Sequence, residues 1–154
     1  MLLKKAQMMI ALACCCWFSI DAVAQSTPSR LLLVCGIESE IPPLSHIEVR
    51  KLFLGLPVEK NGQQLKPLRN SSDPLLTEVF LQKIIFMSKR KYEGQLVARV
   101  FRMGGVRPQV YKKLDELVDV LQQSPVSVTY MWSDQLEQTT NLKLIGVLWE
   151  GSEQ

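Results

Sequence analysis

The chain has 154 residues, of which 47% are apolar and 21% charged, a composition that is typical of a globular protein and excludes a disordered or collagen-like one. The formal net charge is only +3, so the sequence lacks the basic excess that neutralises a phosphate backbone, and we expect no nucleic-acid partner. With one histidine, four cysteines and no glycine-rich phosphate loop, it lacks the usual residues for zinc, catalytic-triad or nucleotide chemistry, and we expect no cofactor.

The N-terminal segment has the pattern of a secretory signal peptide. Two lysines precede an apolar run from Met8 to Ile20, and Ala22-Val23-Ala24 supplies small residues before a cleavage point ahead of Gln25. The run has about 13 residues, short of the roughly 20 that a membrane-spanning helix needs. We therefore expect residues 1–24 to be removed and residues 25–154 to form a single periplasmic domain.

Cleavage would leave Cys35 as the one cysteine of the mature chain. A single thiol forms no internal disulfide, even in an oxidising compartment. Because Cys35 ends an aliphatic run, we expect it to be a buried small hydrophobic residue and not a nucleophile.

The first half of the mature chain predicts a strand, a helix, a strand and a helix. Leu31–Cys35 is an unbroken apolar run, typical of a strand covered on both faces, and it favours a parallel sheet. Ser45 with Glu48 three residues later predicts a capping box, and Asn61-Gly62 predicts a turn into a strand near residues 64–68. Asp73 before Pro74 predicts the N-cap and first residue of another helix. The expected buried positions of the two helices are Val49, Leu52, Phe53 and Leu56, and Leu76, Val79, Phe80, Ile84 and Met87.

The second half predicts two further helices and two strands. Ser88 is the expected cap of a helix that ends at Gly104, and a fourth helix follows around residues 114–121. Strands are expected at residues 126–132 and 142–149. The expected buried positions are Tyr92, Leu96, Val100 and Met103, and Leu114, Leu117, Val118 and Leu121. Helices between strands indicate an α/β fold, with a mixed, mostly parallel sheet flanked by helices.

Several short motifs occur in an order that matches a known family. They are Leu52-Phe53-Leu54-Gly55, Asn61-Gly62, Glu78-Val79-Phe80, Tyr92, Phe101 with Gly104 and Pro108, and Val126-Ser127-Val128-Thr129-Tyr130. In this order they resemble the phosphate-binding-protein-like family of periplasmic solute receptors, and the chain length is similar to that of its short, single-lobe members. The resemblance implies the fold of one lobe of a type II periplasmic binding protein, no enzymatic activity, and binding of phosphate or another small oxyanion for an ABC transporter or sensor.

The resemblance also implies a place for the anion. The family's anion loop has the form Arg-x-x-x-Ser-Gly-Thr and opens a helix, and here Arg69 is followed four residues later by Asp73. Arg69, Ser71 and Ser72 are the ligand residues that this match implies, with an arginine fork and hydroxyl donors. Ser39, in the loop after the first strand, completes the candidate set because ligands bind at the carboxyl ends of strands. The alternative is an ordinary N-cap with a solvated Arg69.

Two functional hypotheses remain open from the sequence. The first is an oxyanion receptor that serves a membrane transporter or sensor. The second is an interaction module without a small ligand that acts as an accessory of an envelope complex. The basic run Lys89–Lys91 is expected to be solvated, or to contact an acidic partner or membrane headgroups, and His46 is expected at the surface. Trp132 and Trp149 are expected to pack in the core or at its rim, or to form an aromatic patch for a partner.

Overall fold

The computed structural model describes residues 29–104 and 107–151, so the expected signal peptide lies outside the described residues. The strands are β1 (Arg30–Gly36), β2 (Glu59–Lys60), β3 (Gln63–Gln64), β4 (Lys66–Asn70), β5 (Gln109–Tyr111), β6 (Ser127–Trp132) and β7 (Leu142–Glu150). The helices are α1 (His46–Phe53), α2 (Pro74–Phe80) with a π-helical turn at Leu81–Ile85, α3 (Lys89–Met103), α4 (Leu114–Gln123) and α5 (Ser133–Glu137). No helix among these residues is both long and apolar enough to cross a membrane.

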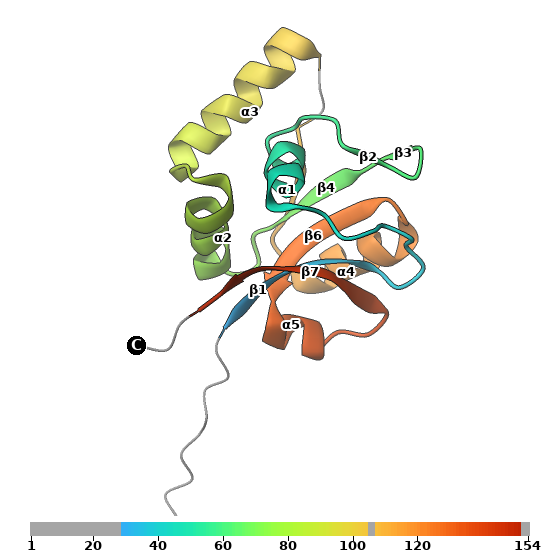
Figure 1. The fold of residues 1–154 in the computed structure, drawn as a ribbon. Coiled ribbons are helices and arrows are strands. Elements are labelled where there is room, and N and C mark those ends of the chain that lie inside the picture. Colours follow the sequence, from blue (N-terminus) through green and yellow to red (C-terminus); the bar gives the residue numbers. More distant parts are fainter. Residues whose placement is uncertain (1–28, 105–106, 152–154) are drawn as a thin grey trace, which may run out of the picture.

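Five strands form one mixed sheet in the order β5-β4-β6-β1-β7, and β2 and β3 form a separate hairpin (Figure 1). β4 runs parallel to β5 and β6, whereas β1 runs antiparallel to β6 and β7. The α/β class and the mixed sheet are confirmed. The expectation of a mostly parallel sheet is wrong, because the pairings divide evenly and the first strand has two antiparallel neighbours.

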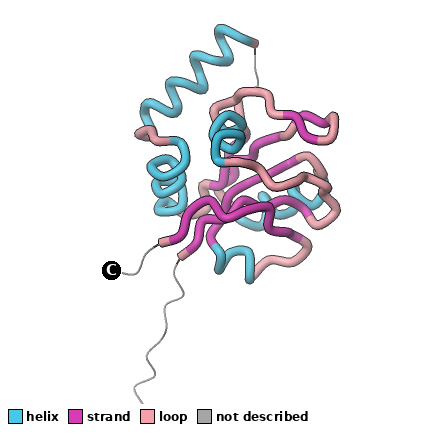
Figure 2. Tube along the Cα trace, in the orientation of Figure 1, coloured by secondary structure: helices cyan, strands magenta, loops and turns pink. Residues whose placement is uncertain are grey.

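Helices cover both faces of the sheet, with α1, α2 and α3 on one side and α4 and α5 on the other (Figure 2). The side chains of β1 alternate between two apolar cores, because successive residues of a strand point to opposite faces. Leu31, Leu33 and Cys35 pack on the side of α1 and α2, and Leu32 and Val34 pack on the side of α4. Burial on both faces therefore explains the unbroken apolar run, whatever the strand direction.

The expected caps are confirmed. Ser45 and Glu48 form the capping box of α1, Asp73 caps α2 with Pro74 in its first turn, and the Ser88 side chain accepts a bond from the Lys91 amide at the start of α3. Asn61 and Gly62 both have positive φ, as the tight turn between β2 and β3 requires. Local side-chain chemistry thus sets where these elements begin.

The expected burial of α3 is only half correct. Tyr92 and Leu96 are buried, but Val100 is 37% and Met103 69% exposed. In Figure 1 the C-terminal end of α3 rises away from the sheet. This end of the helix therefore has apolar side chains at the periodic positions without an element of the described chain to cover them.

Gly36 marks a close approach between the sheet and α4. A Cβ atom built at this position would lie 2.4 Å from the carbonyl oxygen of Leu121. β1 therefore ends in the residue type that lets the C-terminal end of α4 pack directly against its backbone.

Candidate functional site

Arg69 is the charged residue of the expected anion site, and it lies inside the molecule. Only 6% of the residue is exposed, its Nη1 lies 2.9 Å from Oε1 of Glu93 on α3, and its guanidinium lies 5.5 Å from the centre of the Tyr92 ring. The second Glu93 oxygen accepts a bond from Arg107. The alternative of a solvated Arg69 is wrong, because β4 is an inner strand and this side chain points under α3.

Tyr92 forms the floor beneath Arg69. Its hydroxyl donates a 2.7 Å hydrogen bond to the backbone carbonyl of Phe53. Burial raises the pKa of Tyr92 to about 12, and the positive charge of Arg69 partly opposes this shift. Tyr92 is therefore a neutral hydrogen-bond donor and a π-face for the arginine at neutral pH.

The start of α2, where the anion was expected, is occupied by the chain's own carboxylate. Oδ1 of Asp73 accepts bonds from the amides of Leu75 (2.7 Å) and Leu76 (3.3 Å), and Oδ2 accepts a 3.0 Å bond from Nε1 of Trp132. Pro74 has no amide hydrogen to offer. The N-cap interpretation of Asp73 is confirmed, and these helix-start amides already have a negatively charged acceptor.

Asn70 organises the two serines that follow β4. It is fully buried, its Nδ2 donates to the Tyr130 carbonyl, and its Oδ1 accepts from the amide and the hydroxyl of Ser72 at 3.0 and 2.7 Å. The Ser71 amide donates to the Tyr111 carbonyl at 2.8 Å. Sequence reasoning missed Asn70, although a polar residue at the end of a buried strand is a signal for such a network.

Ser39 lies at the other end of the sheet. It is 1% exposed and donates a 2.6 Å bond to the Pro125 carbonyl, just before β6 begins. β1 is antiparallel to β6, and β6 is parallel to β4, so the loop after β1 lies where β4 starts and not where it ends. Arg69, Ser71 and Ser72 follow one another at the end of β4, but Arg69 bonds Glu93 of α3, whereas the Ser72 hydroxyl donates to Asn70 and accepts from Gln135 of α5. The structure does not bring Ser39 to them.

The other residues that the sequence singled out lie at the surface or in the core. His46 is exposed at the start of α1, and Lys89–Lys91 are exposed at the start of α3. Trp132 is 7% exposed and packs in the core, and Trp149 is half-buried and packs against the same core cluster. Within residues 29–104 and 107–151, no three His, Cys, Asp or Glu side chains form a group that could hold a metal ion.

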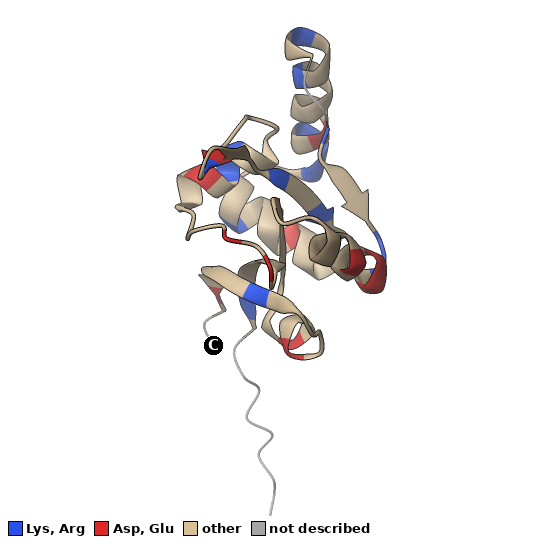
Figure 3. Cartoon of the chain, turned by 90° about the vertical axis from the view of Figure 1, so that its right-hand side faces the viewer, with Lys and Arg blue, Asp and Glu red and all other residues tan. Residues whose placement is uncertain are grey.

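A groove of about 1140 Å³ lies between the C-terminal end of α3, the end of α1 and the β4–β5 edge, and Arg107, which bonds Glu93, is one of its lining residues. Its charged lining residues are Lys66, Arg99 and Arg107. Figure 3 shows the blue basic positions along α3 and the red acidic positions at the start of α4. The groove therefore combines an apolar surface with positive charge.

Comparisons with known proteins connect the fold to one class of receptor. No family model and no curated protein matches the sequence. The crystal structure of an ABC-type phosphate transport receptor from Vibrio cholerae is similar, with 11% sequence identity and a TM-score of 0.57, over 77% of this chain and 46% of the receptor. At this identity the likeness concerns the fold alone, and less than half of the receptor is matched. The described chain therefore has an α/β fold like one lobe of a periplasmic binding protein.

Proposed function

We propose that this chain is a non-enzymatic accessory of the cell envelope that acts through contacts with another protein and does not enclose a small oxyanion. The observation that carries this proposal is the ion-pair cluster in which Glu93 of the chain itself engages both Arg69 and Arg107. Two guanidinium groups that converge on one point are suited to an oxyanion, and here a carboxylate of the chain itself binds to both of them. Arg69, the arginine of the expected anion site, is thus used to join α3 to the sheet.

The other groups of the expected site support the same conclusion. Asp73 holds the amides at the start of α2, and the Ser72 hydroxyl donates to Asn70. An incoming phosphate would have to displace these bonds and approach the Asp73 carboxylate, whose negative charge repels it. A hydrogen bond to a charged group contributes about 1.5 to 3 kcal/mol, so each bond that must be given up weakens binding by roughly tenfold or more.

The second candidate is a receptor for phosphate or another small oxyanion that serves an ABC transporter or a sensor. It is favoured by the convergence of two guanidinium groups on one point and by the similarity to a phosphate transport receptor. In this case the ligand would replace Glu93 between Arg69 and Arg107. Secretion to the periplasm, through the expected signal peptide, belongs to both candidates.

Titration calorimetry of residues 25–154 with phosphate and sulfate separates the two candidates. For an accessory we expect dissociation constants of about 1 mM or weaker, which corresponds to about 4 kcal/mol or less of binding free energy. Arg107→Ala is the informative variant because the Arg107 side chain is 45% exposed and its removal leaves the Arg69 pair in place. Micromolar phosphate binding that this substitution abolishes would establish the receptor and overturn the accessory role.

A further inference from the structure

The groove beside α3 has one sign of charge. All three of its charged lining residues, Lys66, Arg99 and Arg107, are cations, and the lining of the described chain includes no aspartate or glutamate. Glu93 lies against Arg107, but the same carboxylate also serves Arg69, so two positive groups share one negative group. The groove therefore attracts an acidic partner and repels a second copy that would present the same surface.

The groove also has unburied apolar surface. Its apolar lining includes Leu52, Leu56, Pro57, Met103, Pro108 and Val110. Met103 is 69% and Val110 41% exposed, although both line the groove together with the other apolar residues. Concave apolar surface of this kind is stabilised when apolar side chains of a partner fill it.

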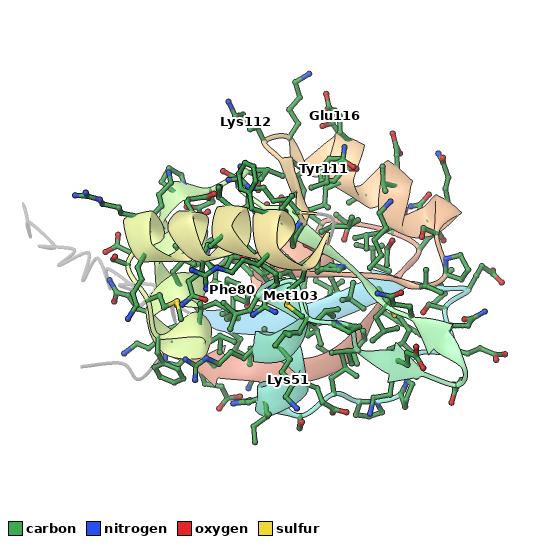
Figure 4. The ribbon with its side chains drawn as sticks, turned by 90° about the horizontal axis from the view of Figure 1, so that it is seen from above. Lys51, Phe80, Met103, Tyr111, Lys112 and Glu116 are labelled. Atoms are coloured by element: carbon green, nitrogen blue, oxygen red, sulfur yellow. The ribbon has the colours of Figure 1, made fainter. Side chains whose placement is uncertain are left out.

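Figure 4 shows how the two sides of this region differ. Seen from above, Met103 at the end of α3 lies toward α1, whereas Lys112 and Glu116 lie on the other side of the helix end, at the outer edge of the molecule. Lys112 is exposed and is not among the groove residues. The acidic start of α4 is therefore separate from the basic groove.

We propose that this groove is the docking site for an acidic segment of a partner protein that also bears apolar side chains. The proposal rests on the accessory role and specifies its surface: acidic groups pair with Lys66, Arg99 and Arg107, and apolar side chains lie against Met103 and Val110. A concave site of about 1140 Å³ fits a segment of chain better than a flat membrane surface.

Fluorescein-labelled 12-residue peptides with residues 25–154 test this proposal by fluorescence anisotropy. The acidic–apolar probe alternates Leu and Glu, a second peptide alternates Ser and Glu, and a third alternates Leu and Lys. We expect the Leu–Glu peptide to bind about tenfold more tightly than either of the others, because it alone satisfies both charge and apolar surface. Equal affinities for the Leu–Glu and Ser–Glu peptides would overturn the proposal by showing unspecific charge attraction.

Two matched pairs of variants locate the binding surface. Lys66→Glu is compared with Lys112→Glu, since both lysines are exposed and only Lys66 lines the groove. Met103→Gln is compared with Ile47→Gln, since both residues are 69% exposed and Ile47 lies outside the groove. Lys66→Glu should weaken binding of the Leu–Glu peptide by about tenfold and Met103→Gln by about fivefold. Each control variant should weaken it by less than about twofold.

Equal effects within each pair would overturn the groove assignment, and so would self-association of the free protein through this surface in sedimentation velocity. The outcome is independent of the oxyanion titration. If phosphate binds weakly and the peptide does not bind the groove, the docking surface is wrong while the accessory role stands. If phosphate binds at micromolar concentration, the accessory role itself is wrong.

Discussion

Arg69 illustrates how one residue changes its role when its neighbours change. This side chain, which was expected from the sequence to bind an anion, is held by Glu93, 24 residues further along the chain, and by the face of Tyr92. A buried arginine without a carboxylate would be costly, so the pair is needed once the side chain points inward. The cluster thereby links β4 to α3.

Replacing Glu93 with glutamine tests this account. Glu93→Gln removes the negative charge between Arg69 and Arg107, and we expect a loss of about 1 to 2 kcal/mol in the free energy of unfolding, moderated because 32% of the Glu93 side chain is exposed. Phosphate should restore part of this stability in the variant, since two guanidinium groups are then free to bind it.

Urea unfolding in phosphate and in chloride at equal ionic strength measures both effects. Glu116→Gln is the control, because its partner Lys113 is 69% exposed and such surface pairs contribute little. If phosphate stabilises Glu93→Gln no more than the wild type, the interpretation of Glu93 as an internal substitute for an oxyanion is wrong.

Tyr92 predicts a specific sensitivity to alkaline pH. Its folded-state pKa of about 12 lies above the ordinary value of 10, so the unfolded chain loses this proton first. The stabilisation is complete below pH 10 and is lost as the pH rises toward 12, by up to about 3 kcal/mol. Burial also raises the pKa of Tyr130, which acts in the same direction.

Urea unfolding of the wild type and Tyr92→Phe at pH 8 and pH 11 checks this sign. At pH 8 the variant should be less stable by about 1 kcal/mol, because the bond to the Phe53 carbonyl is lost. Between the two pH values the wild type should lose more stability than the variant. Equal losses would show that Tyr92 is not responsible for the alkaline effect.

At the scale of elements, the sequence predicts where helices begin better than which way strands run. Capping signals depend on residues three or fewer positions apart, so Ser45 with Glu48, and Asp73 with Pro74, could be recognised directly. The direction of β1 could not be recognised from the sequence, because a strand buried on both faces has the same apolar run in either direction. The placement of Ser39 with the other ligand candidates failed for that reason.

Two short elements, β5 and α5, were not predicted from the sequence. β5 has three residues, and α5 has five and begins where the Trp132 amide donates to the Gln135 side chain. Neither is long enough to show a period, so each depends on tertiary contacts that no local pattern reveals. The exposed end of α3 is the opposite case, in which a helical apolar period exists without a covering element.

Asp73 is the cap on which α2 depends, and it also contacts Trp132 of β6. Asp73→Ala should therefore lower the free energy of unfolding by about 1 to 2 kcal/mol. Ser88→Ala removes a longer, 3.4 Å capping bond at α3 and should cost about half as much. Chemical denaturation of both variants measures the difference, and an equal or smaller effect of Asp73→Ala would show that the bond to Trp132 adds nothing.

At the scale of the whole molecule, two parts of the surface around the mixed sheet differ in the groups that they offer to a partner. At the end of the sheet where β4 and β6 finish, polar groups of Asn70 and Asp73 are bonded within the chain, and next to α3 the basic groove is open. The described fold corresponds to less than half of the similar phosphate transport receptor. The groove is thus the open face on which the proposed accessory role depends.

The whole mature chain should contain one thiol, and that thiol should be hidden. Cleavage after Ala24 would remove the cysteines of the expected signal peptide and leave Cys35. The Cys35 thiol is free and fully buried, and its burial is the main cause that raises its pKa. A thiolate is the reactive form, so both burial and the raised pKa slow its reaction.

Intact-mass analysis of the protein from a periplasmic extract should show a chain that begins with Gln25 or its cyclised form. Titration with a thiol reagent should then detect one group per chain in denaturant and almost none under native conditions, because reaction requires the β1 core to open. A full-length cytoplasmic chain would refute secretion. Rapid native labelling of the mature chain would instead place Cys35 at an accessible surface and contradict the packing of β1 between its two layers of helices.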